Sequence, residues 1–175
     1  MAASDPATAA GNGAADASTP EAPQVAALAQ YVKDLSVENP SAPQVYQWQE
    51  QPQLDVQFNI HVNKIADEVH EVVLKIDASA RSQSGVHFVL DLSYAGIFGL
   101  RNLPEDALPA FLLVEAPRLL FPFARQVVAS SIQDAGFPPL MLDPIDFAAI
   151  YMAQLEAQQQ QAAQGGQQPA EPTVQ

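Results

Sequence analysis

Cysteine is absent from this 175-residue sequence, and cationic side chains are scarce. Without cysteine the chain can form no disulfide, no thiolate zinc site and no cysteine nucleophile. Seven Lys and Arg stand against 20 Asp and Glu, which gives a formal net charge of −13. Because a polyanion needs clustered cations, we expect no nucleic-acid partner. An anionic membrane surface is disfavoured for the same reason.

Long apolar runs and recognisable catalytic motifs are missing as well. No run approaches the ~20 apolar residues of a membrane-spanning helix, and residues 1–24 lack the cationic start and apolar stretch of a secretory signal. There is no glycine-rich phosphate loop and no serine-nucleophile motif. We therefore predict a soluble, cytoplasmic protein that does not insert into membranes, needs no cofactor or metal and is not an enzyme.

Composition divides the chain into a folded body and two tails. Residues 1–24 are rich in alanine and proline, and residues 157–175 are rich in glutamine, so we expect both to be disordered. Residues 25–156 contain 16 of the 20 acidic residues and all seven basic ones. An acidic body of this kind repels copies of itself unspecifically and attracts basic partners.

The first half of the body alternates between apolar and polar residues, which is typical of strands with one wet face. The pattern predicts strands over residues 54–62, 72–78 and 86–94, and a weaker one over 31–38. Residues 81–85 are short enough for an antiparallel hairpin, whereas residues 39–52 form a longer, proline-rich crossover loop. These four strands and their connections predict an antiparallel four-stranded sheet.

Helical patterns fill the second half. Pro104 predicts the start of a helix that ends near Gly136, with breaks or kinks at three further prolines, Pro109, Pro117 and Pro122. Asp143 as N-cap and Pro144 at the first position predict a final helix. The fold class is therefore α+β. Residues 108–132 are apolar almost all round, more than one small sheet can cover, so we expect a homo-oligomer.

The histidines and acidic residues of the sequence do not form one recognisable catalytic or metal-binding set. His61 and His87 fall among the polar positions of their strands, which places them on the solvated face. Asp67, Glu68 and Glu71 form an acidic cluster that could bind a cation or be a solvated turn. These residues favour no enzymatic reaction.

Two surfaces are better candidates for binding. Tyr46 and Trp48 either cap their own core or form, with Phe147, Tyr151 and Leu155 of the final helix, a groove for extended apolar peptide. Asp34, Ser36 and Glu38 point the same way on the first strand, and Val89 and Asp91 do so on the fourth. If these two strands are neighbours, the residues form either a solvated face or a docking site for a basic partner.

Five collinear segments resemble the SecB family of protein-export chaperones. They are YVKDLSVENPSAP from Tyr31, ADEVHEVVL from Ala66, AGIF from Ala95, PRLLFPFAR from Pro117 and FPPLML from Phe137, and residues 144–155 match the final helix of the family. The resemblance covers about residues 25–156.

The resemblance implies a tetramer, a dimer of dimers with helices between sheets. It also implies an ATP-independent holdase that binds unfolded precursor proteins and delivers them to the SecA motor. The client groove would comprise Trp48, Leu54, Val56, Phe58, Phe147, Tyr151 and Leu155. The docking surface, for a basic, zinc-bearing tail of SecA, would comprise Asp34, Glu38, Val89 and Asp91.

Two other functions remain open from the sequence. One is an acidic oligomeric adaptor that binds one folded partner, or an antitoxin-type chaperone dedicated to one partner. The other is a small-ligand enzyme with a pocket at Trp48, which lacks any set of catalytic groups.

Overall fold

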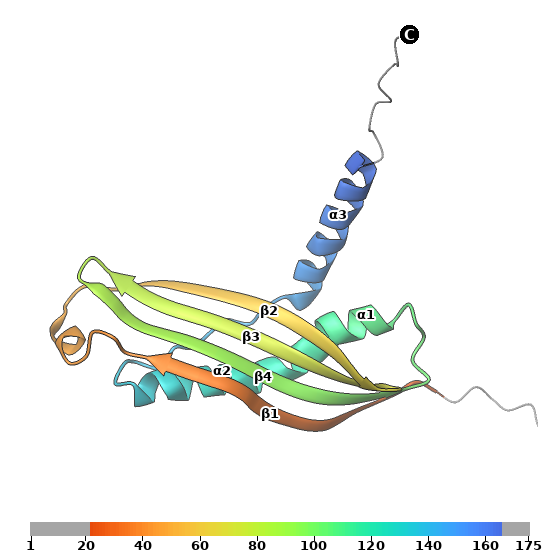
Figure 1. Cartoon of the computed structure of the whole chain (residues 1–175), viewed down its shortest axis with the longest axis horizontal. Coiled ribbons are helices and arrows are strands. Elements are labelled where there is room, and N and C mark those ends of the chain that lie inside the picture. Colours follow the sequence, from red (N-terminus) through yellow and green to blue (C-terminus); the bar gives the residue numbers. More distant parts are fainter. Residues whose placement is uncertain (1–21, 166–175) are drawn as a thin grey trace, which may run out of the picture.

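The computed structural model describes residues 22–165, with side chains to residue 160, as a curved sheet covered on one face by helices (Figure 1). In chain order the elements are β1 (Gln24–Glu38), η1 (Gln44–Gln47), β2 (Gln53–Ala66), β3 (Val69–Ser82), β4 (Gly85–Arg101), α1 (Leu108–Ala110), η2 (Phe111–Glu115), α2 (Ala116–Asp134) and α3 (Phe147–Gly165). The predicted α+β class is confirmed.

The four strands form one antiparallel sheet in the order β1-β4-β3-β2. β3 and β4 are joined by the predicted tight hairpin, in which Ser82 pairs with Gly85. The loop over residues 39–52 carries the chain from the β1 edge to the β2 edge past one end of the sheet (Figure 1). Both β1 and β2 therefore have one unpaired edge.

β1 is longer than its sequence pattern predicts. It begins at Gln24 rather than near residue 31, and it pairs with β4 as far as Arg101. Register shifts at Leu28 and Lys33 interrupt the pairing, and each such bulge reverses the alternation of side chains. A strict period of two is therefore lost over the first half of the strand.

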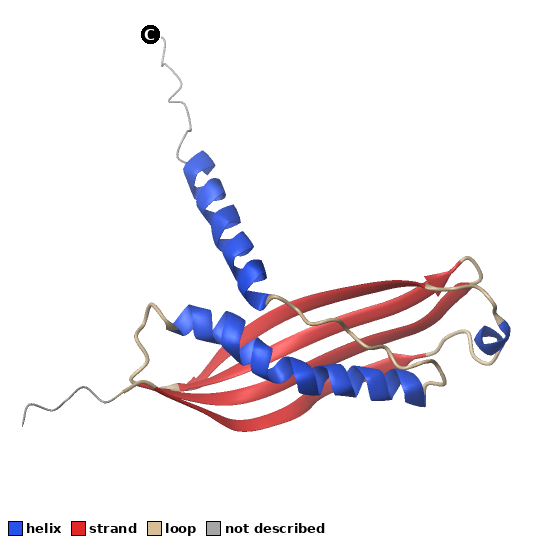
Figure 2. Cartoon of the chain, turned by 180° about the vertical axis from the view of Figure 1, so that it is seen from behind, coloured by secondary structure: helices blue, strands red, loops and turns tan. Residues whose placement is uncertain are grey.

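The helical layer lies across one face of the sheet (Figure 2). α1, η2 and α2 follow one another directly, and the break expected near Pro109 and Pro117 is the π-turn η2, in which Ala116 N–H bonds to Phe111 O. The helix starts at Leu108, not at Pro104, because Pro109 has no N–H to continue a helix begun earlier. α2 continues through the exposed Pro122 without a break and ends before Gly136, as predicted.

The core lies between α2 and the middle of the sheet. Leu74, Leu92, Leu120 and Ile132 are fully buried there. Gly96 on β4 lets α2 approach, because a Cβ at this position would lie 2.7 Å from Leu120 Cδ2. The sheet face opposite α2 is the more exposed one, as the alternation predicts, although Glu71, Val73 and Ala95 are buried on it.

The final helix begins later than the sequence suggests. Its N-cap is Asp146, whose Oδ1 accepts a hydrogen bond of 3.0 Å from Ala149 N–H, and not Asp143. The preceding segment stays extended because it buries Leu142 in the core and packs Ile145 against it. Burial of these side chains outweighs the capping signal of Asp143 and Pro144.

α3 extends to Gly165, into the segment predicted to be a glutamine-rich tail, and it projects away from the sheet (Figure 1). The predicted tails otherwise lie outside the described residues, except that Gln24 already belongs to β1. None of the helices within residues 22–165 is long and apolar enough to cross a membrane.

Candidate functional site

An open pocket of about 510 Å³ lies at the end of the sheet where the crossover loop meets the segment after α2. We call it the Trp48 pocket. Its lining includes Trp48, Leu54, His87, Phe137, Pro139 and Leu140. Phe137 packs against Phe88 with ring centroids 5.3 Å apart. The segment from Phe137 to Leu140, whose prolines keep it extended, forms a wall that the sequence did not reveal.

Tyr46 fixes the crossover loop to the end of α2. Its hydroxyl donates to Ala135 O over 2.8 Å and accepts from Asn39 Nδ2 over 2.7 Å. Its ring lies against Gly136, whose φ of +87° and nearby tyrosine leave no room for a side chain. The loop is thus held in place, and Trp48 at its end is positioned over the sheet.

A second, smaller pocket of about 130 Å³ lies where α3 leaves the body, and we call it the Tyr151 pocket. Phe58, Phe147 and Tyr151 line it together with Leu113 and Ile150. Phe58 and Phe147 both meet the ring of Phe121 from α2, at 6.4 Å and 6.1 Å.

The residues of the predicted client groove are divided between these two pockets. Trp48 and Leu54 line the first, and Phe58, Phe147 and Tyr151 line the second. Val56 lies between Leu54 and Phe58 on the same face of β2 and is half-buried. Phe147 is only 2% exposed and belongs to the core, whereas Leu155 lies one turn beyond Tyr151 and lines neither pocket.

His87 is not on the solvated face, as its position in the sequence pattern predicted, but is 5% exposed beneath Trp48. In the β3–β4 ladder Ala80 pairs with Phe88 and Arg81 pairs with Val86, which leaves His87 as an extra, bulged residue. A bulge changes the side on which a side chain emerges. His61, in contrast, is exposed as predicted.

The four residues of the predicted docking surface share the outer face of the sheet. Glu38 pairs with Val89, and Asp91 pairs with Ser36, two residues from Asp34 on the same face. Directly opposed residues in an antiparallel ladder point to the same side, so β1 and β4 bring these side chains together. The sheet thus joins residues that are more than fifty positions apart in the chain.

One lysine compensates part of this acidic face. Lys75 Nζ lies 3.0 Å from Asp91 Oδ2 and 3.5 Å from Asp77 Oδ1. The hydrogen bond to Asp91 is the main reason why the pKa of Lys75 is raised, while burial is the main reason why the pKa of Asp77 is raised. The four carboxylates of Asp34, Glu38, Asp77 and Asp91 and the ammonium of Lys75 together carry a formal charge of −3.

Further along the outer face, the Glu71 carboxylate binds polar side chains from both edge strands. Lys33 Nζ lies 2.7 Å from Glu71 Oε2, and Asn63 Nδ2 donates to the same oxygen over 3.0 Å. The Tyr31 hydroxyl donates to Glu71 Oε1. The Lys33 hydrogen bonds, followed by those of Tyr31 and Asn63, lower the pKa of Glu71 to about 2.

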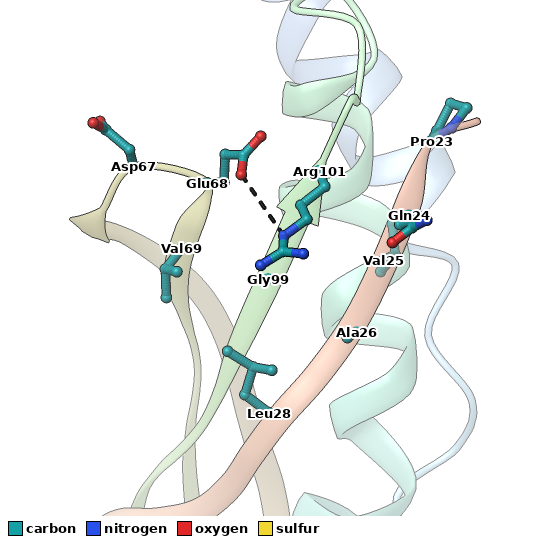
Figure 3. A pocket seen from close by; sticks show the side chains of 10 residues that line it. All are labelled: Pro23, Gln24, Val25, Ala26, Leu28, Asp67, Glu68, Val69, Gly99 and Arg101. Atoms are coloured by element: carbon teal, nitrogen blue, oxygen red, sulfur yellow. Dashed lines mark ion pairs between the residues drawn. The ribbon is translucent and has the colours of Figure 1, made fainter. Parts of the chain in front are cut away.

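The acidic cluster of Asp67, Glu68 and Glu71 does not converge on one point. Asp67 pairs with Lys64 at 3.0 Å, and Glu68 pairs with Arg101 at 3.9 Å across an open hollow of about 630 Å³ (Figure 3). Glu71 belongs to the network described above. Within residues 22–165 no group of three or more His, Asp or Glu side chains could hold a metal ion.

Comparison with known proteins gives one consistent answer. The family model described as "Preprotein translocase subunit SecB" matches residues 18–159. The chain is 56% identical over 145 residues to the protein-export protein SecB of Zymomonas mobilis, covering 83% of this chain and 88% of the relative. It is 52% identical over 168 residues to the protein of that name from Erythrobacter litoralis, covering 95% and 91%.

The fold also matches a solved structure, the Mycobacterium tuberculosis Rv1957 SecB-like chaperone in complex with a ChAD peptide from the Rv1956 HigA1 antitoxin. The TM-score is 0.57 at 18% identity, over 70% of this chain and 90% of that one, which supports the fold alone. The family match over most of the chain, with relatives above 50% identity, decides the function. This chain belongs to the SecB family and is a protein-export chaperone, not an enzyme.

Proposed function

We propose that this chaperone works in the cytoplasm as a tetramer, a dimer of dimers. It holds unfolded precursor proteins in the client groove without ATP and delivers them to SecA through the docking surface. The names of its relatives support a role in protein export. The client groove and the docking surface are assigned to the residues defined from the sequence.

The observation that carries the proposal is the incompletely covered apolar face of β2. Val56 and Phe58 are half-buried, and Leu54 is 53% exposed, although all three point to the helix side. The strip connects the Trp48 pocket with the Tyr151 pocket, and β2 has a free edge beside it. An extended peptide can place apolar side chains along such a strip and pair its backbone with the edge.

Shallow apolar sites of this kind favour unfolded clients. Each pocket covers a few side chains and binds weakly by itself. A long unfolded chain occupies several pockets, and several subunits, at once, so its affinity rises through effective concentration. A folded protein exposes too few contiguous apolar side chains to do the same.

Exposed apolar residues support the tetramer. Val25, Val32 and Leu35 of the edge strand β1 are 41–45% exposed. On the outer side of α2, Leu119 is 48% exposed and Phe123 is 52% exposed. An unpaired edge strand and an uncovered apolar helix face are surfaces that a second copy covers.

The groove is tested with an unfolded precursor as the client and its refolding rate as the measurement. Val56→Asp and Tyr151→Asp are each expected to weaken client binding about tenfold or more, because a carboxylate must lose water against an apolar chain. Both variants should keep the native mass of the assembly.

Matched controls place the same charge on the opposite side of the same elements. Gln57→Asp on β2 and Ala153→Asp on α3 lie at exposed positions, and we expect both to bind the client like the wild type. Client affinity that is unchanged by Val56→Asp and Tyr151→Asp would contradict the groove.

The docking surface is tested by a double variant. Asp34→Ala with Glu38→Ala is expected to weaken SecA binding about fivefold or more, since two exposed charges that attract a basic partner are lost. The difference from wild type should shrink as salt is added, because salt screens exposed charges.

The control for net charge is Glu105→Ala with Asp106→Ala, two exposed residues before α1. It removes the same charge away from the docking surface and should leave SecA binding intact. If both double variants weakened SecA binding equally, net charge rather than this surface would be responsible.

A further inference from the structure

We propose that the Trp48 pocket is a tyrosine subsite of the client groove, in which His87 forms a hydrogen bond with the phenol hydroxyl of a client tyrosine. The inference rests on the proposed client groove and adds a side-chain preference to it. Besides Tyr46, two ionisable residues line the Trp48 pocket, His87 and Glu50. The Glu50 carboxylate is already bonded to the backbone N–H and the hydroxyl of Ser84, so His87 is the one that meets the aromatic wall.

His87 is a polar residue without a polar environment. Its side chain lines the Trp48 pocket and is 5% exposed. Its Nε2 is buried and has no hydrogen-bond partner among the residues that the structure describes. Its ring instead meets two aromatic side chains, Trp48 at 5.0 Å and Phe137 at 6.4 Å.

The unpartnered Nε2 of His87 destabilises the protein while the pocket is empty. It therefore favours ligands that can form a hydrogen bond with it. A buried polar atom that lacks a partner is costly, and a ligand that supplies the partner removes this cost. A site built to bond a hydroxyl discriminates against the analogue without it. The Trp48 pocket therefore favours an apolar side chain that carries one hydrogen-bonding group.

Tyrosine fits this description better than the other aromatic residues. Phenylalanine fills an apolar pocket but leaves Nε2 unpartnered. The indole N–H of tryptophan only donates, whereas a phenol hydroxyl can either donate to Nε2 or accept from it. A cavity of about 510 Å³ has room for a tyrosine ring and the neighbouring client backbone.

Trp48 is the side chain that controls access to His87. It meets His87 edge-on at an interplanar angle of 74° and covers it, but it is itself half-buried. Its ring also lies close to Gly85, where a Cβ would be 3.1 Å from Trp48 Cη2. The hydrogen bond to His87 therefore requires the indole of Trp48 to turn aside when a client ring enters.

The test uses two unfolded peptides that differ only by the hydroxyl group of one side chain. Both are 15-residue peptides of the same Gly-, Ser- and Leu-containing sequence, with Tyr or Phe at the centre. Binding to the full-length protein is measured by calorimetry and by the fluorescence of Trp48, the only tryptophan. We expect the Tyr peptide to bind about 3- to 10-fold more tightly, the contribution of one net hydrogen bond.

Variants of His87 assign this preference to its nitrogen. His87→Leu keeps an apolar wall and should bind both peptides alike, with the Phe peptide bound about as well as by the wild type. His87→Asn retains a hydrogen-bonding side chain and should keep part of the preference. His61→Leu, on the exposed face of β2, should keep all of it, and circular dichroism verifies that each variant is folded.

The outcomes separate this inference from the proposed function. Equal binding of the two peptides by the wild type, or a preference that survives in His87→Leu, overturns the tyrosine subsite and leaves the groove standing. Peptide binding that Val56→Asp does not weaken overturns the groove itself.

Discussion

At the scale of single residues, Glu71 is the clearest case of a side chain whose properties come from the fold. Glu71 is 7% exposed, and its carboxylate receives hydrogen bonds from Tyr31, Lys33 and Asn63. Tyr31 and Lys33 belong to one edge strand and Asn63 to the other. A paired, hydrogen-bonded carboxylate of this kind contributes to stability only while it is ionised.

Glu71→Gln is therefore expected to lower the free energy of unfolding at pH 7 by about 2 kcal/mol. The pKa of Glu71 is about 2 in the folded protein against an ordinary 4.5. Because the folded-state pKa is depressed, the stabilisation is complete above about pH 5 and is lost as the pH falls from 4.5 towards 2. Urea unfolding at pH 7, 5 and 3 should show the gap between wild type and variant closing.

Glu68→Gln is the comparison, since the Glu68–Arg101 pair is 3.9 Å long and both side chains are more than half exposed. It should change the stability little at any pH. A Glu71→Gln protein as stable as the wild type at pH 7 would contradict the role given to the network.

At the scale of elements, the contact between α2 and β4 depends on one glycine. A Cβ at Gly96 would lie 2.7 Å from Leu120 Cδ2 and 2.9 Å from Phe98 Cε2. Both neighbours are fully buried and have no free space to move into. The helical layer can therefore lie this close to the sheet only while position 96 has no side chain.

Gly96→Ala is expected to destabilise the protein by about 1–3 kcal/mol, the usual cost of overpacking a core. Thermal unfolding at fixed protein concentration measures it. Gly99→Ala on the same strand is the matched control, because its Cβ would meet Leu28 at an ordinary 3.6 Å. Equal effects of the two substitutions would show that strand propensity, and not the contact with α2, is responsible.

At the scale of the whole molecule, one chain leaves apolar side chains uncovered in two places, on the edge strand β1 and on the outer side of α2. β1 exposes several apolar side chains at one edge of the sheet, and Leu119 and Phe123 are exposed one helical turn apart on α2. α3 projects beyond the body (Figure 2). These features are typical of a subunit whose remaining contacts come from other copies.

Sedimentation should give a mass of about four times the 18.7 kDa chain. Leu119→Glu with Phe123→Glu is expected to shift the protein to smaller species, because two charges on this helix face oppose burial. Gln53→Glu with Gln57→Glu adds the same charge to exposed positions of β2 and should leave the mass unchanged. A wild type that sediments as a monomer would contradict the proposed tetramer.

The sequence by itself determined the strands with strict alternation, the β3–β4 hairpin, the end of α2 before Gly136 and the acidic residues of the outer face. These features depend on local periodicity and turn chemistry, which neighbouring residues already contain. The five motifs shared with the SecB family also lie in the sequence, and the comparisons confirm that family.

Only the tertiary structure decided where bulges reverse the alternation and where burial outweighs a local signal. His87 is turned inward by an extra residue in β4, and the early half of β1 is a strand because β4 pairs with it. The cap of α3 moves from Asp143 to Asp146 because Leu142 and Ile145 pack on the core. In each case the deciding contact comes from residues distant in the chain, so no window of sequence contains it.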